Sequence, residues 1–366
     1  MEISASTLYA RIGRWVLFFV AAAASFSGYY QKWHFGEADM PGDHARASFE
    51  SMVDGTAYRP YVYRQLIPTL ANWTDRAVPA GIKSALLAQQ STDEPFLSAI
   101  SSSPTANKPE YFFRYVVVYG LTFLFAWLAV FAMHLVCAAV GLSRAAAVLA
   151  PVILILLVPY IQSIGGFFYD YAELAFLALA VWIALKFEWW VLIPVAALGE
   201  WNKESFVLIV LTLYPLIRLR RSRVAALAAI AVLCGVCLAV YLPVRMRFAQ
   251  NPGGTVELQW MDQLRFLAHP REFLFATEET YGVRMLRTCT VLPMALLVWT
   301  IWRAWKRLPI AMRRHALIAA AINIPLYLLF CYPGELRNLS MLYVVLLLCI
   351  AANLDDALKA RETATA

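Results

Sequence analysis

Long apolar stretches separated by short polar turns dominate the chain, and ten of them predict membrane helices. Several approach the roughly 20 apolar residues that a helix needs to cross a hydrocarbon layer of about 30 Å. The pattern predicts an all-α, polytopic transmembrane helix bundle, folded as a single membrane domain over residues 1–366. The predicted segments are 12–30, 114–139, 146–163, 171–187, 189–200, 204–217, 224–243, 286–303, 315–331 and 338–354.

The stretch "WWVLIPVAALGEWNKESFVLIVLTLYPLI" is apolar but carries charges at its centre. As one helix it would place Glu200, Lys203 and Glu204 in mid-membrane, where charged side chains are costly. We therefore expect two helical pieces joined at "GEWNKES". The first piece has about twelve residues, roughly 18 Å, so we expect the break to lie in a protein-lined cavity below the membrane surface.

Two long polar segments are expected outside the membrane, over residues 31–113 and 247–285. The first contains "VPAGIKSALLAQQ", residues 78–90, which suits a short amphipathic helix in the interface. The second contains "LQWMDQLRFLAHPREFLF", where aromatic and charged residues alternate as interfacial segments do.

Composition and charge support a membrane location, and the basic net charge can be explained without nucleic-acid binding. The chain is 61% hydrophobic and 15% charged, whereas soluble domains are nearer half apolar and a quarter charged. The net charge of +7 lies largely in two basic turns, "RLRRSR" and "RAWKRLPIAMRRH". The positive-inside rule places such turns in the cytoplasm, where they also meet anionic lipid heads.

The predicted topology describes a multi-pass protein with both termini in the cytoplasm. A cleaved signal peptide is the alternative for the first segment, because a basic start precedes a short apolar core. In this topology the segment 31–113 and the motifs "GGFFYDYAEL", "GEWNKES" and "YPGELRN" share the outer side. A purely structural protein has no reason to gather four polar motifs there.

Three acids of the first outer segment are candidates for a catalytic base. Asp43 follows Pro41-Gly42 and precedes a helical pattern, so it suits an N-cap as well as a general base that deprotonates an acceptor hydroxyl. Glu37 and Asp39 compete for the catalytic role, whereas Asp54 in "VDGTAY" suits a turn.

Basic and aromatic residues alternate in "YRPYVYRQLIP", which contains Arg59, Tyr63 and Arg64. Arginine forks match phosphate oxygens, and tyrosines suit the lipid–water boundary. Anion binding and interfacial anchoring with cation–π contacts both explain this pattern.

Ionisable residues also lie at the outer ends of three later segments. Asp170 and Glu173 begin one apolar helix, and charges inside a membrane are functional candidates by default. Lys203 and Arg337 are the cations available to pair with them. A substrate site and structural ion pairs therefore stay open as interpretations, and the candidate substrate-binding residues on these segments are Asp170, Glu173, Lys203, Glu204, Glu335 and Arg337.

Motifs of the common soluble enzymes are missing from the sequence. No Walker loop, G-x-S-x-G, H-E-x-x-H or Cys/His ligand pattern occurs, and His44 beside Asp43 is the single hint of a metal site. The six cysteines lie in or beside apolar segments, so a disulfide framework is not expected.

The order of these motifs resembles the polytopic GT-C class of glycosyltransferases. The shared pattern is a first span, an outer segment with an acid about a dozen residues on, and "G-x-x-Y…P-x-x-Y-R-x-L-x-P". In detail "YRPYVYRQLIP", "FYDYAEL", "NKES" and "ELRN" resemble recurring motifs of a bacterial group related to these enzymes.

The resemblance implies transfer of a sugar from a polyprenyl-phosphate carrier to a glycan, lipid or protein acceptor outside the cytoplasm. It implies that the catalytic acid of the first outer segment is Asp43, and that Arg59, Arg64, Lys203 and Arg337 bind the carrier phosphate. The chain lacks the large soluble C-terminal domain and the clear acidic pair of larger members. A divalent cation is therefore compatible with the resemblance but is not indicated by a motif.

Two other functions fit parts of the sequence. A transporter or flippase of a lipid-linked or anionic substrate would also use broken helices and buried charges, but the cytoplasmic halves of these segments are apolar and no inverted repeat is visible. A membrane acyltransferase would need an intramembrane histidine, and His134 in "FAMHLVC" better suits helix packing.

Overall fold

The computed structural model describes residues 5–32, 44–101, 103–162, 166–254 and 258–365. Helices make up nearly all of this regular structure, and each of the ten predicted apolar segments overlaps helix, although the helix within 286–303 begins only at Val291. Within these described ranges, five helices are long and apolar enough to cross a membrane. The prediction of an all-α membrane protein is confirmed, while ten crossings and the GT-C fold stay predictions.

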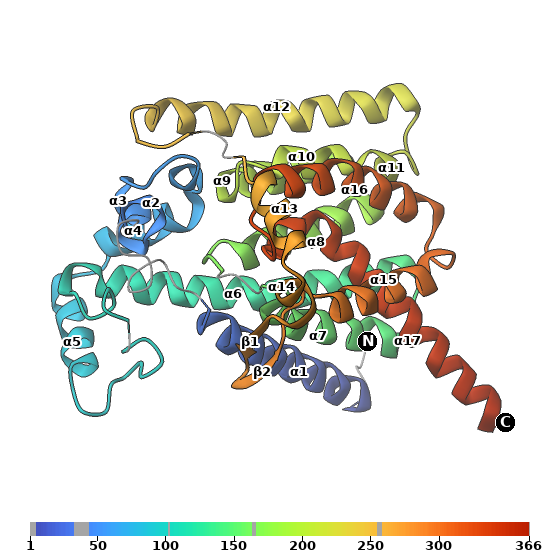
Figure 1. Ribbon diagram of the computed structural model, residues 1–366, viewed down its shortest axis with the longest axis horizontal. Coiled ribbons are helices and arrows are strands. Elements are labelled where there is room, and N and C mark those ends of the chain that lie inside the picture. Colours follow the sequence, from blue (N-terminus) through green and yellow to red (C-terminus); the bar gives the residue numbers. More distant parts are fainter. Residues whose placement is uncertain (1–4, 33–43, 102, 163–165, 255–257, 366) are drawn as a thin grey trace.

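The five long apolar helices form much of the bundle. They are α1 (Ala5–Tyr30), α6 (Pro109–Val140), α7 (Arg144–Ile161), α12 (Arg223–Arg247) and η3 (Leu336–Leu342) continuing into α17 (Tyr343–Thr365). Helix α1 packs on α6 and α7, and α17 packs on α7. In Figure 1, α12 runs along one edge of the molecule, and its side chains are mostly exposed.

Shorter helices complete the bundle. They are α8 (Asp170–Lys186), η2 (Trp189–Val191), α9 (Leu192–Asn202), α10 (Phe206–Thr212), α11 (Tyr214–Ile217), α15 (Val291–Trp305) and α16 (Ile310–Phe330). Helix α8 is buried almost throughout and packs on α6 and α9, so it lies at the centre of the core. The buried core is continuous from α1 to α17.

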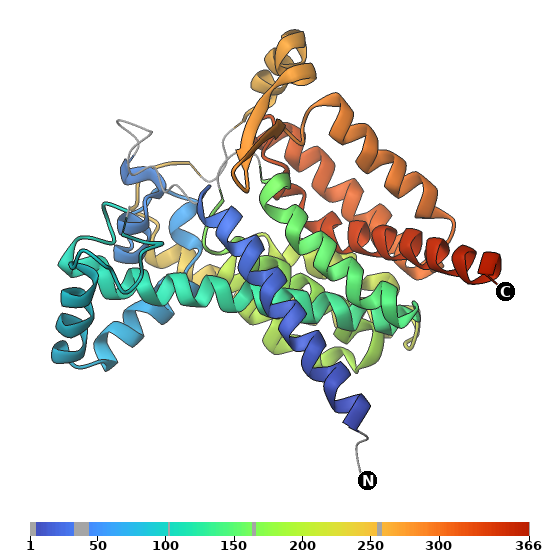
Figure 2. The ribbon, with the colours of Figure 1, turned by 90° about the horizontal axis from the view of Figure 1, so that it is seen from below.

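The first polar segment folds into short helices at one end of the molecule. They are α2 (His44–Ala47), α3 (Phe49–Asp54), η1 (Tyr61–Tyr63), α4 (Leu66–Ala77) and α5 (Ala80–Gln90), and the last of these confirms the helix predicted over 78–90. Both views place them away from the first residues of α1 and the last residues of α17 (Figures 1 and 2).

The second polar segment contains a β-hairpin that the sequence analysis did not predict. Helices α13 (Trp260–Ala268) and α14 (Pro270–Phe275) precede β1 (Thr277–Thr280) and β2 (Val283–Leu286), which pair antiparallel. The hairpin turns at Tyr281 and Gly282, both with positive φ, as a tight two-residue connection requires. This part protrudes from the helices in Figure 2.

The two polar segments contact each other and the same helix ends. The Asn251 side chain donates to the carbonyls of Gly55 and Ala57, both at 2.9 Å, and the Arg59 N–H donates to the Pro252 carbonyl. Lys32, just beyond α1, pairs with Glu278 of the hairpin at 2.9 Å. Both segments therefore lie at one side of the bundle.

The break in the apolar stretch 189–217 is confirmed, because α9 ends at Asn202 and α10 begins at Phe206. Gly199 permits close packing of the two pieces. A Cβ atom there would lie 2.6 Å from the ring of Phe206, which is buried.

We therefore expect Gly199→Ala to destabilise the protein by about 1–3 kcal/mol through overpacking, measured as a lower melting temperature in detergent. Gly235→Ala, in the middle of α12 with open space around the new methyl group, is the matched control and should be neutral or slightly stabilising. Equal melting temperatures for the two variants would contradict the close contact at the break.

Candidate functional site

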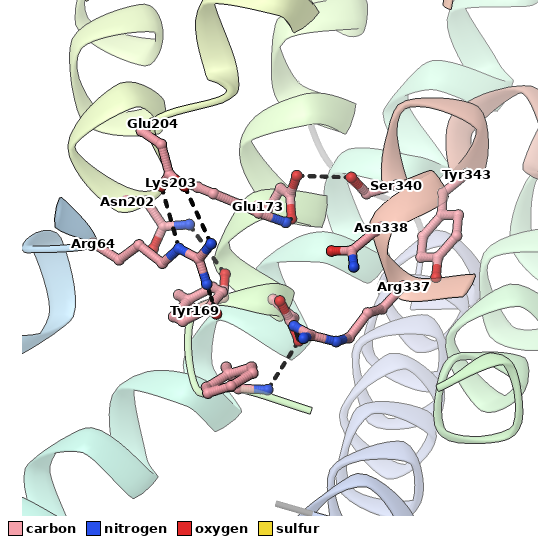
Figure 3. Close-up of polar contacts among 12 residues, drawn as sticks. Arg64, Tyr169, Glu173, Asn202, Lys203, Glu204, Arg337, Asn338, Ser340 and Tyr343 are labelled. Carbon is pink, nitrogen blue, oxygen red and sulfur yellow. Dashed lines mark hydrogen bonds and ion pairs between the residues drawn. The ribbon is translucent and has the colours of Figure 1, made fainter. Parts of the chain in front are cut away.

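Seven of the charged residues singled out in the sequence meet in one cluster, called here the buried charged cluster, in which five residues are buried and Glu204 and Glu335 are half-buried. Arg64 follows η1, Asp170 and Glu173 begin α8, Lys203 and Glu204 lie in the α9–α10 break, and Glu335 and Arg337 lie at the start of η3. Figure 3 shows five of these side chains turned toward one another from separate elements: Arg64, Glu173, Lys203, Glu204 and Arg337. The cluster is defined by Arg64, Asp170, Glu173, Lys203, Glu204, Glu335 and Arg337.

The α9–α10 break presents its two charges because the chain leaves the helix there. Lys203 is extended, at φ −153° and ψ 124°, and its N–H still donates to the Gly199 carbonyl. Asn202 donates from its amide to the Tyr169 carbonyl at 3.0 Å, which ties the break to the start of α8. Glu200 accepts from the Val207 N–H at 2.8 Å and so satisfies a free donor at the start of α10.

The most deeply buried pair joins Lys203 to Glu173. The ammonium nitrogen lies 2.6 Å from Glu173 Oε2, and the two side chains are 8% and 3% exposed. The hydroxyl of Ser340 donates to Glu173 Oε1 at 2.7 Å. Both carboxylate oxygens are thus occupied, as a charge in this setting requires.

A second pair joins Arg64 to Glu204 through two hydrogen bonds. Arg64 Nε donates to Glu204 Oε2 at 3.2 Å and Nη2 donates to Oε1 at 3.1 Å. Its Nη1 donates to the Tyr169 hydroxyl, and the guanidinium lies over the rings of Tyr61 and Tyr169.

The third part of the cluster centres on Arg337. Its Nη1 lies 3.5 Å from Asp170 Oδ2, its Nη2 donates to Glu335 at 3.4 Å, and its guanidinium lies 4.6 Å from the centre of the Phe167 ring. Asp170 Oδ2 also accepts from the Phe167 N–H at 2.9 Å. Three buried atoms here have no hydrogen-bond partner: Asp170 Oδ1 and the Nε and Nη1 atoms of Arg337.

The formal charges of the cluster do not favour a simple phosphate cradle. Its three cations face four carboxylates, so the cluster carries one excess negative charge. Each cation is already neutralised by at least one acid. An added anion would therefore depend on the unused donors of Arg337 or on cations beyond the cluster.

Arg59 and Tyr63 do not join the cluster's ion pairs. Arg59 Nη2 donates to the Gly253 carbonyl at 2.6 Å, and no acid pairs with Arg59 in the described part of the chain. The Tyr63 ring packs edge-on to Tyr241 at 5.9 Å, and its buried hydroxyl has no partner.

The structure adds neutral residues that the sequence analysis did not assign. Phe167 and Tyr169 stack at 5.1 Å, and their faces receive the two arginines of the cluster. Asn202 and Ser340 hold the break and Glu173. Each lies within three residues of a charged candidate in the same motif, and that proximity was the available signal.

The three candidate bases, Glu37, Asp39 and Asp43, lie outside the residues that the structure describes. Within the described ranges, no group of three His, Cys, Asp or Glu side chains could hold a metal ion. His134, the acyltransferase candidate, contacts the Ala147 carbonyl at 2.8 Å and Arg14 at 3.3 Å, which agrees with helix packing.

Comparison with protein-family models, curated proteins and solved structures gave no match for this chain.

We expect Lys203→Met to destabilise the protein by about 3–5 kcal/mol, because it leaves Glu173 buried without its counter-charge. Thermal or denaturant unfolding in detergent measures the change. Lys83→Met is the matched control, since Lys83 pairs with Asp75 at 3.1 Å on the surface, where such pairs contribute about 0–1 kcal/mol.

The double variant Lys203→Met/Glu173→Gln should recover part of the lost stability, because no unpaired charge then remains. A single variant no less stable than Lys83→Met would show that Lys203 and Glu173 do not form a buried pair.

Proposed function

We propose that the protein is a membrane glycosyltransferase of the GT-C type. It would move a sugar from a polyprenyl-phosphate carrier to a glycan, lipid or protein acceptor on the extracytoplasmic side of the bacterial inner membrane. One observation carries the proposal: motifs from four distant parts of the chain meet in the buried charged cluster, beside the first polar segment. These are the motifs on which the resemblance to this class rests.

The chemistry needs a base, a site for the leaving phosphate and a binding surface for the sugar. The acceptor hydroxyl attacks the anomeric carbon, the bond from that carbon to the phosphate oxygen breaks, and the phosphate leaves with added negative charge. A carboxylate removes the hydroxyl proton, and Asp43 takes this role in the proposal. Cations placed beforehand near the phosphate lower the barrier to its departure.

Arg59 is the cation best suited to the leaving phosphate. Its side chain donates to the Gly253 carbonyl and no acid pairs with it among the described residues, whereas Arg64 and Lys203 are paired with acids. Arg337 can add its two unused donors. In this proposal Arg64, Glu173, Lys203 and Glu204 position the walls of the site.

Two half-buried aromatic side chains beside the cluster support binding of a sugar. Tyr61 and Phe167 are half-buried there, with ring centres 5.6 Å apart, and aromatic faces with a few polar groups are typical of small-molecule sites. Asp170 Oδ1 has no partner and could accept from a sugar hydroxyl.

A transporter or flippase is the second candidate, and the charge balance of the cluster favours it. Acids in excess over cations within a largely buried cluster are typical of ion-coupled transport sites. The two functions differ in outcome, because transfer cleaves the sugar–phosphate bond and transport does not.

The proposal predicts that residues 60, 202 and 335 face the extracytoplasmic side and that both termini face the cytoplasm. The physical reason is that the two basic turns favour the cytoplasmic face of the membrane. Their position then determines on which side of the membrane each of the other loops lies. Reporter fusions or cysteine labelling in intact cells measure each position. Any one of the three residues on the cytoplasmic side would contradict a shared outer site.

The proposal also predicts that Asp43→Asn lowers sugar transfer by about 10²–10⁴-fold, because the base is lost. The purified protein is placed in vesicles with a panel of polyprenyl-phosphate-linked hexoses and pentoses, and released polyprenyl phosphate is measured. Asp54→Asn is the matched control, since Asp54 pairs with Arg114 at 2.8 Å and should leave transfer unchanged.

Equal transfer by the two variants would move the base to another acid. If the unaltered protein moves the intact donor to the other leaflet without cleaving its sugar, the result would contradict the transferase and support the transporter.

A further inference from the structure

A crevice of about 300 Å³ lies between α7, α15 and α17, apart from the buried charged cluster. Helix α17 packs against the other two helices, and all three run near one another in Figures 1 and 2. One end of the crevice is apolar, with Leu157, Leu297 and Leu346 among its lining residues. The other end carries Thr300, Arg303 and Asn353.

The polarity of the crevice changes along the helix axes. Arg303 lies six residues after Leu297, about 9 Å along α15, and Asn353 lies seven residues after Leu346, about 10 Å along α17. Arg303 also begins the basic turn "RAWKRLPIAMRRH". The crevice therefore runs from the apolar middle of the helices to the basic end of α15.

Arg303 is the uncompensated charge at the polar end. The Asn353 amide donates to the Thr300 carbonyl and its oxygen accepts from Arg307. Arg307 also pairs with Asp356 at 2.9 Å. Arg303 is exposed and lies 5.6 Å from the centre of the Trp299 ring, and no acid pairs with it among the described residues. Its guanidinium is therefore available to a ligand.

We propose that the crevice binds an anionic phospholipid, with an acyl chain along the apolar end and the phosphate on Arg303. Hydrocarbon fits the leucine-lined part, and an arginine fork matches phosphate oxygens. Basic pockets between membrane helices at the cytoplasmic side bind anionic head groups. The occupant is a lipid of the surrounding leaflet, distinct from the polyprenyl donor of the proposed reaction.

Native mass spectrometry of the full-length protein in detergent tests the site. The protein is titrated with phosphatidylglycerol and with phosphatidylethanolamine of the same acyl chains, and the anionic lipid should bind more tightly. Arg303→Gln should weaken phosphatidylglycerol binding about fivefold, as loss of one basic residue near an anionic lipid predicts. Arg314→Gln, an exposed charge in the same turn that does not line the crevice, should leave it unchanged.

A second pair of variants tests the apolar end. Leu297→Trp should block the crevice and abolish the preference for phosphatidylglycerol. Leu296→Trp, at a residue 56% exposed outside the crevice, should keep that preference and controls for folding. Equal effects within either pair of variants, or equal binding of the two lipids, would overturn the proposal.

Discussion

Charges buried between helix ends must be paired, and this constraint fixes how the elements around the cluster meet. An unpaired ion in such a setting costs several kcal/mol, and removing one partner of a buried pair is strongly destabilising. The three main pairs join residue 64 to 204, 173 to 203 and 170 to 337. Each pair therefore fixes the position of one element relative to another that is distant in the chain.

The helices could be predicted because burial in lipid leaves a simple record in the sequence. Backbone groups in hydrocarbon must bond within their own segment, so apolar runs of membrane length become helices. The break before Phe206 was equally readable, since Lys203 and Glu204 are too costly for mid-membrane. The hairpin was missed because "TEETYGVRML" has little apolar alternation, although its Tyr-Gly pair is a turn signal.

The charged members of the cluster could be predicted from the sequence because charges beside apolar helices are costly, but the sequence did not predict which of them pair. A charge beside an apolar helix stands out, whereas the sequence allowed Lys203 or Arg337 as partners for either Asp170 or Glu173. Tertiary packing places Lys203 against Glu173 and Arg337 against Asp170. Neutral groups such as Ser340, which completes the bonding of Glu173, resemble ordinary helix residues in sequence and were missed.

The cluster has more acids than cations, and this negative charge determines which ligands it can bind. A phosphate brought against this cluster would meet net repulsion, so the proposed binding of a lipid phosphate requires a cation outside it, and the proposal assigns that role to Arg59 in the adjoining polar segment. The acids instead suit the sugar, whose hydroxyls donate hydrogen bonds, and Asp170 keeps one oxygen unused. If the phosphate and the sugar bind at separate positions, the bond that joins them lies between those positions. It would then be near the polar segment that carries the candidate base. In the proposed function, a site arranged in this way would bind a lipid-linked sugar by its two ends and leave the reacting bond open to an acceptor.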